Sequence, residues 1–302
     1  MFTNASNFTN DVDFTFAVII GISLFFLIGL TALMIYFMFR YHHTRNPKAT
    51  DIPHNTTLEV LWTVIPTLLV LLMFYYGWAG YTKMRTAPDD AMVVKATGRM
   101  WAWTFEYENG IIADTLVIPK DKAVKLELTS EDVIHSLFIP AFRIKEDLVP
   151  GADNWMWFIG QVEGSYSIFC AEYCGDRHSY MISKVDVISP DAFDLWYNDT
   201  TASEDPAGLV LLKNNACMSC HSTDGNRLVG PSFKEMYGRE TAVVLEDGTE
   251  QTIKVDDDYI IESINEPNAK VVATYPKGVM TSYKDKFNDE ERQQIIDYLK
   301  TL

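Results

Sequence analysis

Residues 170–181 read Cys170-Ala-Glu-Tyr-Cys174-Gly-Asp-Arg-His178-Ser-Tyr-Met181, so two thiols, an imidazole and a thioether fall within twelve residues. The glycine after Cys174 lets the chain curl until both sulfur atoms face one point on a tight loop. Soft sulfur ligands beside imidazole favour copper among the common first-row metals. A second histidine should complete the set, and His135 is the candidate because it ends an alternating, strand-like run before a turn signal. The stretch therefore predicts a copper electron-transfer centre.

Composition bounds the kinds of protein that this chain can be. Its 302 residues suffice for two or three domains. A net charge of −16 argues against a nucleic-acid partner, because phosphates require a basic surface. The four cysteines fall in two pairs at the spacing of cofactor ligands, Cys170/Cys174 and Cys217/Cys220. Two short disulfides in an extracellular domain are the alternative explanation of these pairs.

Two apolar runs predict a transmembrane helical hairpin over residues 14–90, preceded by a short polar segment at 1–13. Residues 14–39 and 60–82 carry no charge, and each run exceeds the roughly 20 residues needed to cross a bilayer. The loop between them is basic, which predicts a cytoplasmic loop and an outer location for everything else. A cleaved signal peptide is the alternative for the first run, but that run is too long and lacks a small-residue cleavage site.

Strand-like alternation over residues 91–188 predicts an all-β sandwich or barrel. The expected strands, separated by Gly, Pro, Asn and Asp, are 92–97, 100–107, 123–129, 154–159 and 165–169. The copper loop follows the last of them, where a sheet edge can hold ligands in fixed geometry. Trp101 and Trp103 should share one strand face. Core packing is the ordinary explanation of that pair, and conduction of electrons to the metal is the alternative.

A second cofactor motif opens a domain expected over residues 207–302, after a polar linker at 189–206. Cys217-Met-Ser-Cys220-His221 has the spacing at which two thiols add to the vinyl groups of haem and the next histidine ligates the iron. A zinc site is the alternative, but no second cysteine pair remains to complete four ligands.

A high-potential haem of this kind takes a methionine as its second axial ligand. Met280 lies in an extended loop before an amphipathic helix at 289–299, whereas Met236 follows the haem motif closely and is better explained by packing. We therefore predict Met280 as the ligand. We also expect a backbone carbonyl of Gly230-Pro231 to hold the other ring nitrogen of His221.

With these motifs identified, the chain resembles subunit II of the haem-copper cytochrome c oxidases, in the form with a fused C-terminal cytochrome c domain. The resemblance extends over nearly all of residues 14–302. It implies a multi-domain membrane protein with a two-helix transmembrane hairpin, a cupredoxin-like all-β domain and an all-α class I cytochrome c domain. It also implies a dinuclear copper A centre bridged by both thiolates. The implied copper ligands are the side chains of His135, Cys170, Cys174, His178 and Met181 and the backbone carbonyl of Glu172.

Five positions match further motifs of that family. The Glu172 side chain is implied to face a magnesium site shared with subunit I. Trp101 corresponds to the tryptophan through which electrons enter the copper centre from an external cytochrome c. Glu59 matches a carboxylate at the mouth of a proton channel into subunit I, although an interfacial carboxylate in water is the alternative reading of its position. Pro231 and Met280 fit the cytochrome pattern, but Thr281 stands where proline usually follows the axial methionine.

The resemblance implies the electron-input subunit of a proton-pumping terminal oxidase in a bacterial cytoplasmic membrane, with both cofactor domains on the periplasmic side. Electrons would pass from a donor, such as a cytochrome c or an upstream respiratory complex, through haem c and copper A to subunit I, which reduces O₂ to water. Subunit I, together with subunit III, is the implied partner. The alternatives are the input subunit of a copper A nitric oxide reductase and a membrane-tethered electron carrier without a catalytic partner. A quinol oxidase subunit would lack the copper cysteines.

The C-terminal domain is acidic. Residues 203–302 hold 18 Asp and Glu against 11 Lys and Arg, a net charge of −7. An acidic face could steer a basic donor cytochrome, and an acidic soluble domain without steering is the alternative. Ionic strength separates the two explanations, because salt screens steering.

Overall fold

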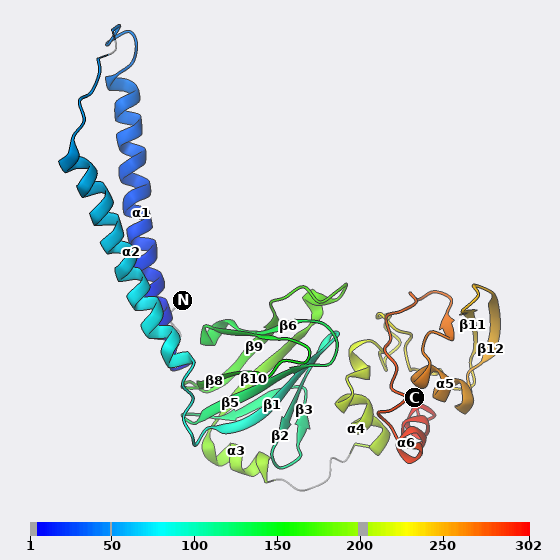
Figure 1. The fold of residues 1–302 in the computed structure, drawn as a ribbon. Helices are drawn as coiled ribbons and strands as arrows, with labels where there is room; N and C mark the ends of the chain where they lie inside the picture. Colours follow the sequence, from blue (N-terminus) through cyan, green and yellow to red (C-terminus); the bar gives the residue numbers. More distant parts are fainter. Residues whose placement is uncertain (1–4, 49, 199–204) are drawn as a thin grey trace.

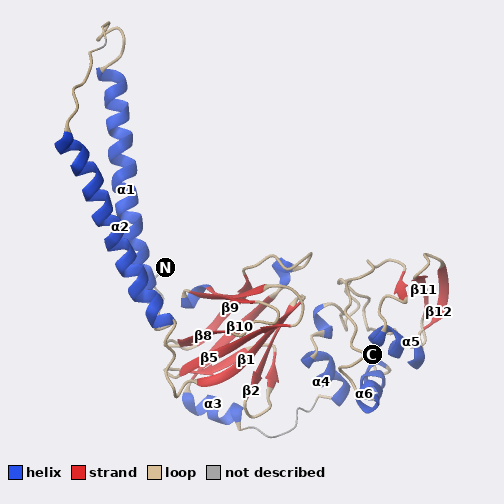
Figure 2. Cartoon of the chain, in the orientation of Figure 1, coloured by secondary structure: helices blue, strands red, loops and turns tan. Residues whose placement is uncertain are grey.

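The computed structural model describes residues 5–48, 50–198 and 205–302, which form a helical hairpin, a β-sandwich and a smaller C-terminal domain (Figure 1, Figure 2). In chain order the elements are α1 (Thr9–Arg40), α2 (Thr56–Met84), β1 (Met92–Arg99), β2 (Ala102–Tyr107), β3 (Ile112–Ala113), β4 (Leu116–Pro119), β5 (Ala123–Ser130), β6 (His135–Ile139), η1 (Pro140–Phe142), β7 (Ile144–Leu148), β8 (Asn154–Ile159), β9 (Gly164–Cys170), η2 (His178–Tyr180), β10 (Ile182–Ile188), α3 (Pro190–Tyr197), α4 (Ala207–Asn214), η3 (Cys217–Ser219), β11 (Glu240–Leu245), β12 (Glu250–Lys254), α5 (Asp257–Asn265), β13 (Lys270–Val272) and α6 (Asp289–Leu299).

Helices α1 and α2 form the predicted antiparallel hairpin, with the start of α1 and the end of α2 beside the sandwich (Figure 1). Their apolar windows have mean hydropathies of 2.7 and 2.0, and by length and composition both helices could cross a membrane. The first helix begins before the apolar run because its polar residues have partners. Asp13 lies 2.8 Å from Nε of Arg143 in the sandwich, and Asp11 lies 2.6 Å from Nζ of Lys83 in α2. The first pair ties the hairpin to the β-domain, and the second joins the two helices of the hairpin.

The β-domain is a sandwich of two five-stranded sheets, in the orders β3-β2-β1-β5-β8 and β4-β10-β9-β6-β7. Strand β1 pairs parallel with β5 and β4 pairs parallel with β10, whereas the other pairs in these sheets are antiparallel. Fully buried side chains from both sheets fill the space between them, including Phe105, Leu126, Ile139 and Ile168. This packed core holds the strand ends that carry the copper ligands.

The interpretation of His135 as the end of a strand was wrong. Strand β5 ends at Ser130, residues 131–134 turn, and His135 is the first residue of β6. The Ser130 hydroxyl donates to the Val133 carbonyl at 2.5 Å and accepts from the Asp132 amide at 3.3 Å, which closes the turn. Alternation alone did not reveal this break, because both flanking strands alternate in the same way.

The C-terminal domain packs α4 against α6, and α6 lies where the sequence predicts an amphipathic helix. Gly208 stands at their crossing, where a Cβ atom would collide with the carbonyl oxygen of Gln294. Helix α6 begins at a capping box in which Asn288 and Glu291 bond each other's backbone amides. The domain also carries a three-stranded sheet, β12-β11-β13, that the sequence pattern did not predict.

Candidate metal centre and haem pocket

Adjacent strands bring three of the predicted copper ligands together. Cys170 ends β9 and His135 opens β6, and these strands pair antiparallel. The Sγ atom of Cys170 lies 3.8 Å from Sγ of Cys174 and 3.9 Å from Nδ1 of His135. The donor atoms of these three buried residues all lie within 4.8 Å of one another. The cysteines are free, and their sulfur separation is far beyond the roughly 2.05 Å of a disulfide.

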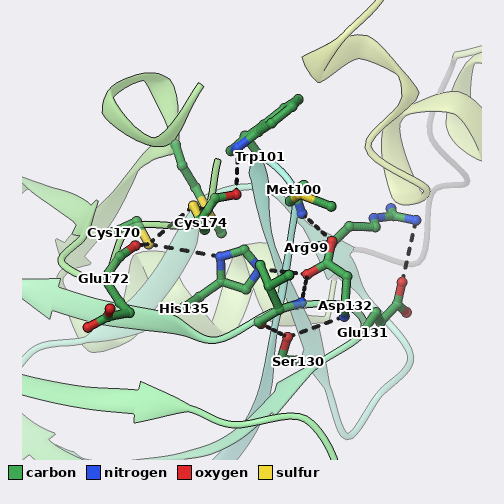
Figure 3. A network of polar contacts seen from close by, with 12 residues as sticks. Arg99, Met100, Trp101, Ser130, Glu131, Asp132, His135, Cys170, Glu172 and Cys174 are labelled. Atoms are coloured by element: carbon green, nitrogen blue, oxygen red, sulfur yellow. Dashed lines mark hydrogen bonds and ion pairs between the residues drawn. The ribbon is translucent and has the colours of Figure 1, made fainter. Parts of the chain in front are cut away.

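The remaining predicted ligands come from the loop after β9. The Sγ atom of Cys174 lies 3.6 Å from Nδ1 of His178 and 3.8 Å from Sδ of Met181. The backbone oxygen of Glu172 lies 3.2 Å from Sγ of Cys170, while its carboxylate points away from the sulfur atoms (Figure 3). All six predicted donors therefore converge, and two thiols with imidazole and thioether form a set suited to copper.

The two thiols ionise differently. Burial opposes ionisation of Cys170, but hydrogen bonds from His135 and from backbone amides outweigh it and lower the pKa of the thiol to about 6. Burial and the charge on Cys170 raise the pKa of Cys174 to about 12. One thiolate is thus present near neutral pH, and a bound cation is needed to remove the second proton.

Sequence reasoning missed Asp132, which fixes the orientation of His135. Its Oδ1 lies 2.7 Å from Nε2 of His135, and its Oδ2 accepts the Met100 amide at 2.7 Å (Figure 3). A carboxylate on Nε2 keeps a proton there, so Nδ1, on the side of Cys170, is the nitrogen that would exchange its own proton for a metal. Burial alone would raise the pKa of Asp132, but the bonds from His135 and from backbone amides lower it. A carboxylate three residues before the histidine, in a turn, was the available signal.

Trp101 and Trp103 both hydrogen-bond to the backbone of the copper loop. Trp101 donates its ring N–H to the carbonyl of Cys174 at 3.1 Å, and Trp103 donates to the carbonyl of Met181 at 3.4 Å. Their exposed fractions are only 8% and 2%. Both rings therefore pack in the core and contact the candidate metal site at the same time.

A cavity in the C-terminal domain is lined by the predicted haem residues, namely Cys217, Cys220, His221, Pro231 and Met280. Nδ1 of His221 lies 2.8 Å from the carbonyl oxygen of Pro231, which confirms the predicted hydrogen bond. Because a carbonyl only accepts, Nδ1 carries the proton and Nε2 is left to bind a metal. Burial lowers the pKa of His221, which keeps the imidazole neutral. Met236 lines the same cavity. Location in the cavity wall therefore does not decide which of Met236 and Met280 is the axial ligand.

Close packing sets the plane of the His221 ring. The ring stacks on Phe233 with centroids 4.6 Å apart, and a Cβ atom at Gly230 would lie only 2.5 Å from Cε1 of the histidine. Two free thiols, a neutral imidazole and a largely apolar wall fit a covalently attached haem.

The β-sandwich completes the wall of this cavity. Arg99, Met100 and Asp132 line it together with the haem-motif residues. Asp132 therefore belongs to both candidate centres, because the same carboxylate bonds His135 of the copper set. The sequence gives no signal for this juxtaposition, since the two segments are far apart along the chain.

Glu59 lies apart from both centres. It occupies the first turn of α2, at the end of the hairpin away from the sandwich, and its Oε1 lies 2.9 Å from Nδ1 of His54. Any role of the Glu59 carboxylate is therefore separate from the copper and haem sites and concerns the helical hairpin.

Known protein families match each of the three parts of the chain. The family model for the transmembrane domain of cytochrome c oxidase subunit II matches residues 1–78, that for its periplasmic domain matches 110–188, and that for cytochrome c matches 207–302. Cytochrome c oxidase subunit 2 of Alkalihalophilus pseudofirmus is 30% identical over 304 residues, covering 94% of this chain and 85% of that protein. The Cereibacter sphaeroides subunit 2 is 29% identical over 223 residues, covering 61% and 72%. The solved periplasmic domain of subunit II from Bradyrhizobium japonicum is 29% identical with a TM-score of 0.35, covering 37% of this chain and 94% of that one.

Proposed function

We propose, from the premise that this chain belongs to the cytochrome c oxidase subunit II family, that it is the electron-input subunit of a proton-pumping haem-copper oxidase. A donor, such as a cytochrome c or an upstream respiratory complex, would give one electron at a time to a haem c held by this chain. Each electron would then pass to a dinuclear copper A centre and on to subunit I, where O₂ would be reduced to water. These transfers change the charge of each centre by one and form or break no bond in this chain.

One observation carries the proposal. A single carboxylate, Asp132, lines the cavity of the haem motif and also bonds His135 of the copper set at 2.7 Å. Two redox sites joined by one side chain suit transfer between them better than two independent binding functions. A rigid, buried ligand cage supports the same function, because it limits the rearrangement that accompanies a change of charge.

The copper centre would be held by the side chains of His135, Cys170, Cys174, His178 and Met181 and by the Glu172 carbonyl. Each of the two sulfur atoms has an imidazole nitrogen within 4 Å. The tryptophans at 101 and 103 hold the loop through its carbonyls, so the donors need little reordering when metal binds.

The haem would be attached through Cys217 and Cys220 and ligated by His221 and Met280, with Pro231 orienting the histidine. Bound haem supplies one-electron chemistry that no side chain offers. Trp101, between Met100 of the cavity wall and the carbonyl of Cys174, is a further candidate for the electron route.

The membrane partners follow from the hairpin. We propose that α1 and α2 span the bacterial cytoplasmic membrane against subunit I, with subunit III in the same complex and the copper and haem domains in the periplasm. The Glu172 carboxylate, which is exposed and turned away from the thiols, would reach a magnesium ion shared with subunit I. Glu59 would stand at the mouth of a proton channel.

The purified complex tests this function directly. We expect two coppers and one c-type haem per copy of this chain, oxygen consumption with a reduced donor, and proton release outside sealed vesicles. A Cys170→Ser variant should lose the copper and oxygen consumption but keep the c haem. Nitric oxide consumption in place of oxygen consumption, or a chain that purifies without a larger haem subunit, would contradict the proposal.

A further inference from the structure

We propose that Arg99, Glu131, Tyr283 and Lys286 form an interdomain latch, which holds the haem cavity closed against the copper domain. The inference rests on the proposed function and adds a defined docking surface to it. Arg99 and Glu131 come from the sandwich, at the end of β1 and in the turn after β5. Tyr283 and Lys286 come from the loop between β13 and α6.

Arg99 is the buried member of the latch. Its side chain is only 10% exposed, and a buried guanidinium is costly unless it is paired. Its Nη1 donates to the hydroxyl of Tyr283 at 3.1 Å and lies 3.5 Å from Oε2 of Glu131. The guanidinium carbon also lies 5.5 Å from the centroid of the Tyr283 ring. Two of these three contacts cross between domains, so separation of the domains would leave Arg99 poorly paired.

Glu131 links cations from the two domains. Its Oε1 lies 2.7 Å from Nζ of Lys286, while Oε2 faces Arg99 (Figure 3 draws the Arg99 side). Without this carboxylate, two positive groups would face each other across the domain boundary. The arrangement therefore favours contact through charge as well as shape.

A second contact joins the copper loop to the haem motif itself. Nη1 of Arg177, in the copper loop, donates to the carbonyl of Ser219 at 2.5 Å. In addition, Cys220, Val229 and Val279 of the C-terminal domain pack against the hydrophobic cluster of the sandwich. Several polar contacts together with an apolar patch fix the orientation of the two domains as well as their proximity.

The latched arrangement has a consequence for the donor. Arg99, Met100 and Asp132 line the cavity on the copper side, so the sandwich surface at Met100, the residue before Trp101, faces this chain's own C-terminal domain. An external donor must therefore reduce the haem domain first, on a face that the latch leaves open, and cannot dock on the copper domain while the latch is closed.

A matched pair of charge reversals tests the latch in the intact oxidase. Lys286→Glu replaces an attractive contact with Glu131 by a repulsive one, whereas Lys284→Glu makes the same charge change two residues away, where the lysine faces Glu266 of its own domain at 3.8 Å. Because both members of the Lys286 pair are partly exposed, we expect a fall of about five-fold in the ratio of latched to open chain. Hydrogen-exchange protection of peptides over 99–101 and 217–221 should fall by that factor in Lys286→Glu and stay unchanged in Lys284→Glu.

A cross-link tests whether the latched state is the one that transfers electrons. Glu131→Cys with Lys286→Cys, bridged by a short bifunctional thiol reagent, should lock the domains and leave the rate from haem to copper within two-fold of the unbridged protein. Equal exchange protection in the two lysine variants, or loss of transfer on locking, would overturn the latch. If the unmodified chain itself shows no transfer from haem to copper, the proposed function fails instead.

Discussion

Replacing Asp132 by asparagine should weaken copper binding about 10- to 100-fold, because Asp132 is the hydrogen-bond partner of a metal-binding histidine. The two carboxylate oxygens accept three hydrogen bonds. Oδ1 lies 2.7 Å from Nε2 of His135 and from the Val133 amide, and Oδ2 lies 2.7 Å from the Met100 amide. An asparagine has one oxygen and one NH₂ group, so either His135 or Met100 would face a donor instead of an acceptor.

The expected loss corresponds to roughly 1.4–2.7 kcal/mol of copper-binding free energy. A chelator titration of the isolated complex measures it, with copper per chain followed by metal analysis and haem c as the internal standard. Asp147→Asn is the matched control, since it makes the same charge change on the neighbouring strand β7, where Asp147 accepts from the Ser136 hydroxyl at 2.6 Å and bonds no copper ligand. Equal copper retention in the two variants would refute the role assigned to Asp132.

Three other outcomes follow from the geometry. Gly230→Ala should destabilise the C-terminal domain by about 1–3 kcal/mol and alter the axial-ligand bands of the haem spectrum without loss of the covalent haem, because its Cβ would lie 2.5 Å from Cε1 of His221; an unchanged spectrum would show that the ring is not confined. In copper-free protein, thiolate absorbance should rise near pH 6 as Cys170 ionises. The contribution of its lowered pKa to the stability of the fold should be full above pH 9 and lost as the pH falls through about 6. A single rise in thiolate absorbance near pH 9 would contradict this. Donor oxidation should slow as salt rises if the acidic C-terminal domain steers a basic donor, and a flat profile would exclude steering.

The identity of the candidate copper ligands could be predicted from their spacing in the sequence. The residues that hydrogen-bond to those ligands and to their loop could not. The sequence placed Cys170, Cys174, His178 and Met181 in one loop, and the structure brings His135 to them by pairing β6 with β9. The support from Asp132 and Trp103 depends on the turn before β6 and on the pairing of distant strands. Neither is encoded in local alternation, because the same pattern fits a continuous strand.

Domain order was likewise readable from composition, whereas domain contact was not. Apolar run length, strand alternation and the haem motif mark the three parts in sequence. The contacts of Arg99 with Tyr283 and of Glu131 with Lys286 join residues more than a hundred positions apart. The sheet β12-β11-β13 escaped prediction because its strands are short, because β12 is mostly exposed, and because Val243 is the one fully buried residue of β11.

Rapid mixing of the intact oxidase with a reduced donor, without oxygen, tests the central claim most directly. Haem c and copper absorbance are followed together, in the unaltered chain and in Cys170→Ser. We predict that haem c is reduced first and copper second in the unaltered chain, and that haem c stays reduced without onward transfer in the variant. Reduction of copper before haem c, or onward transfer at an undiminished rate in Cys170→Ser, would contradict the proposed path.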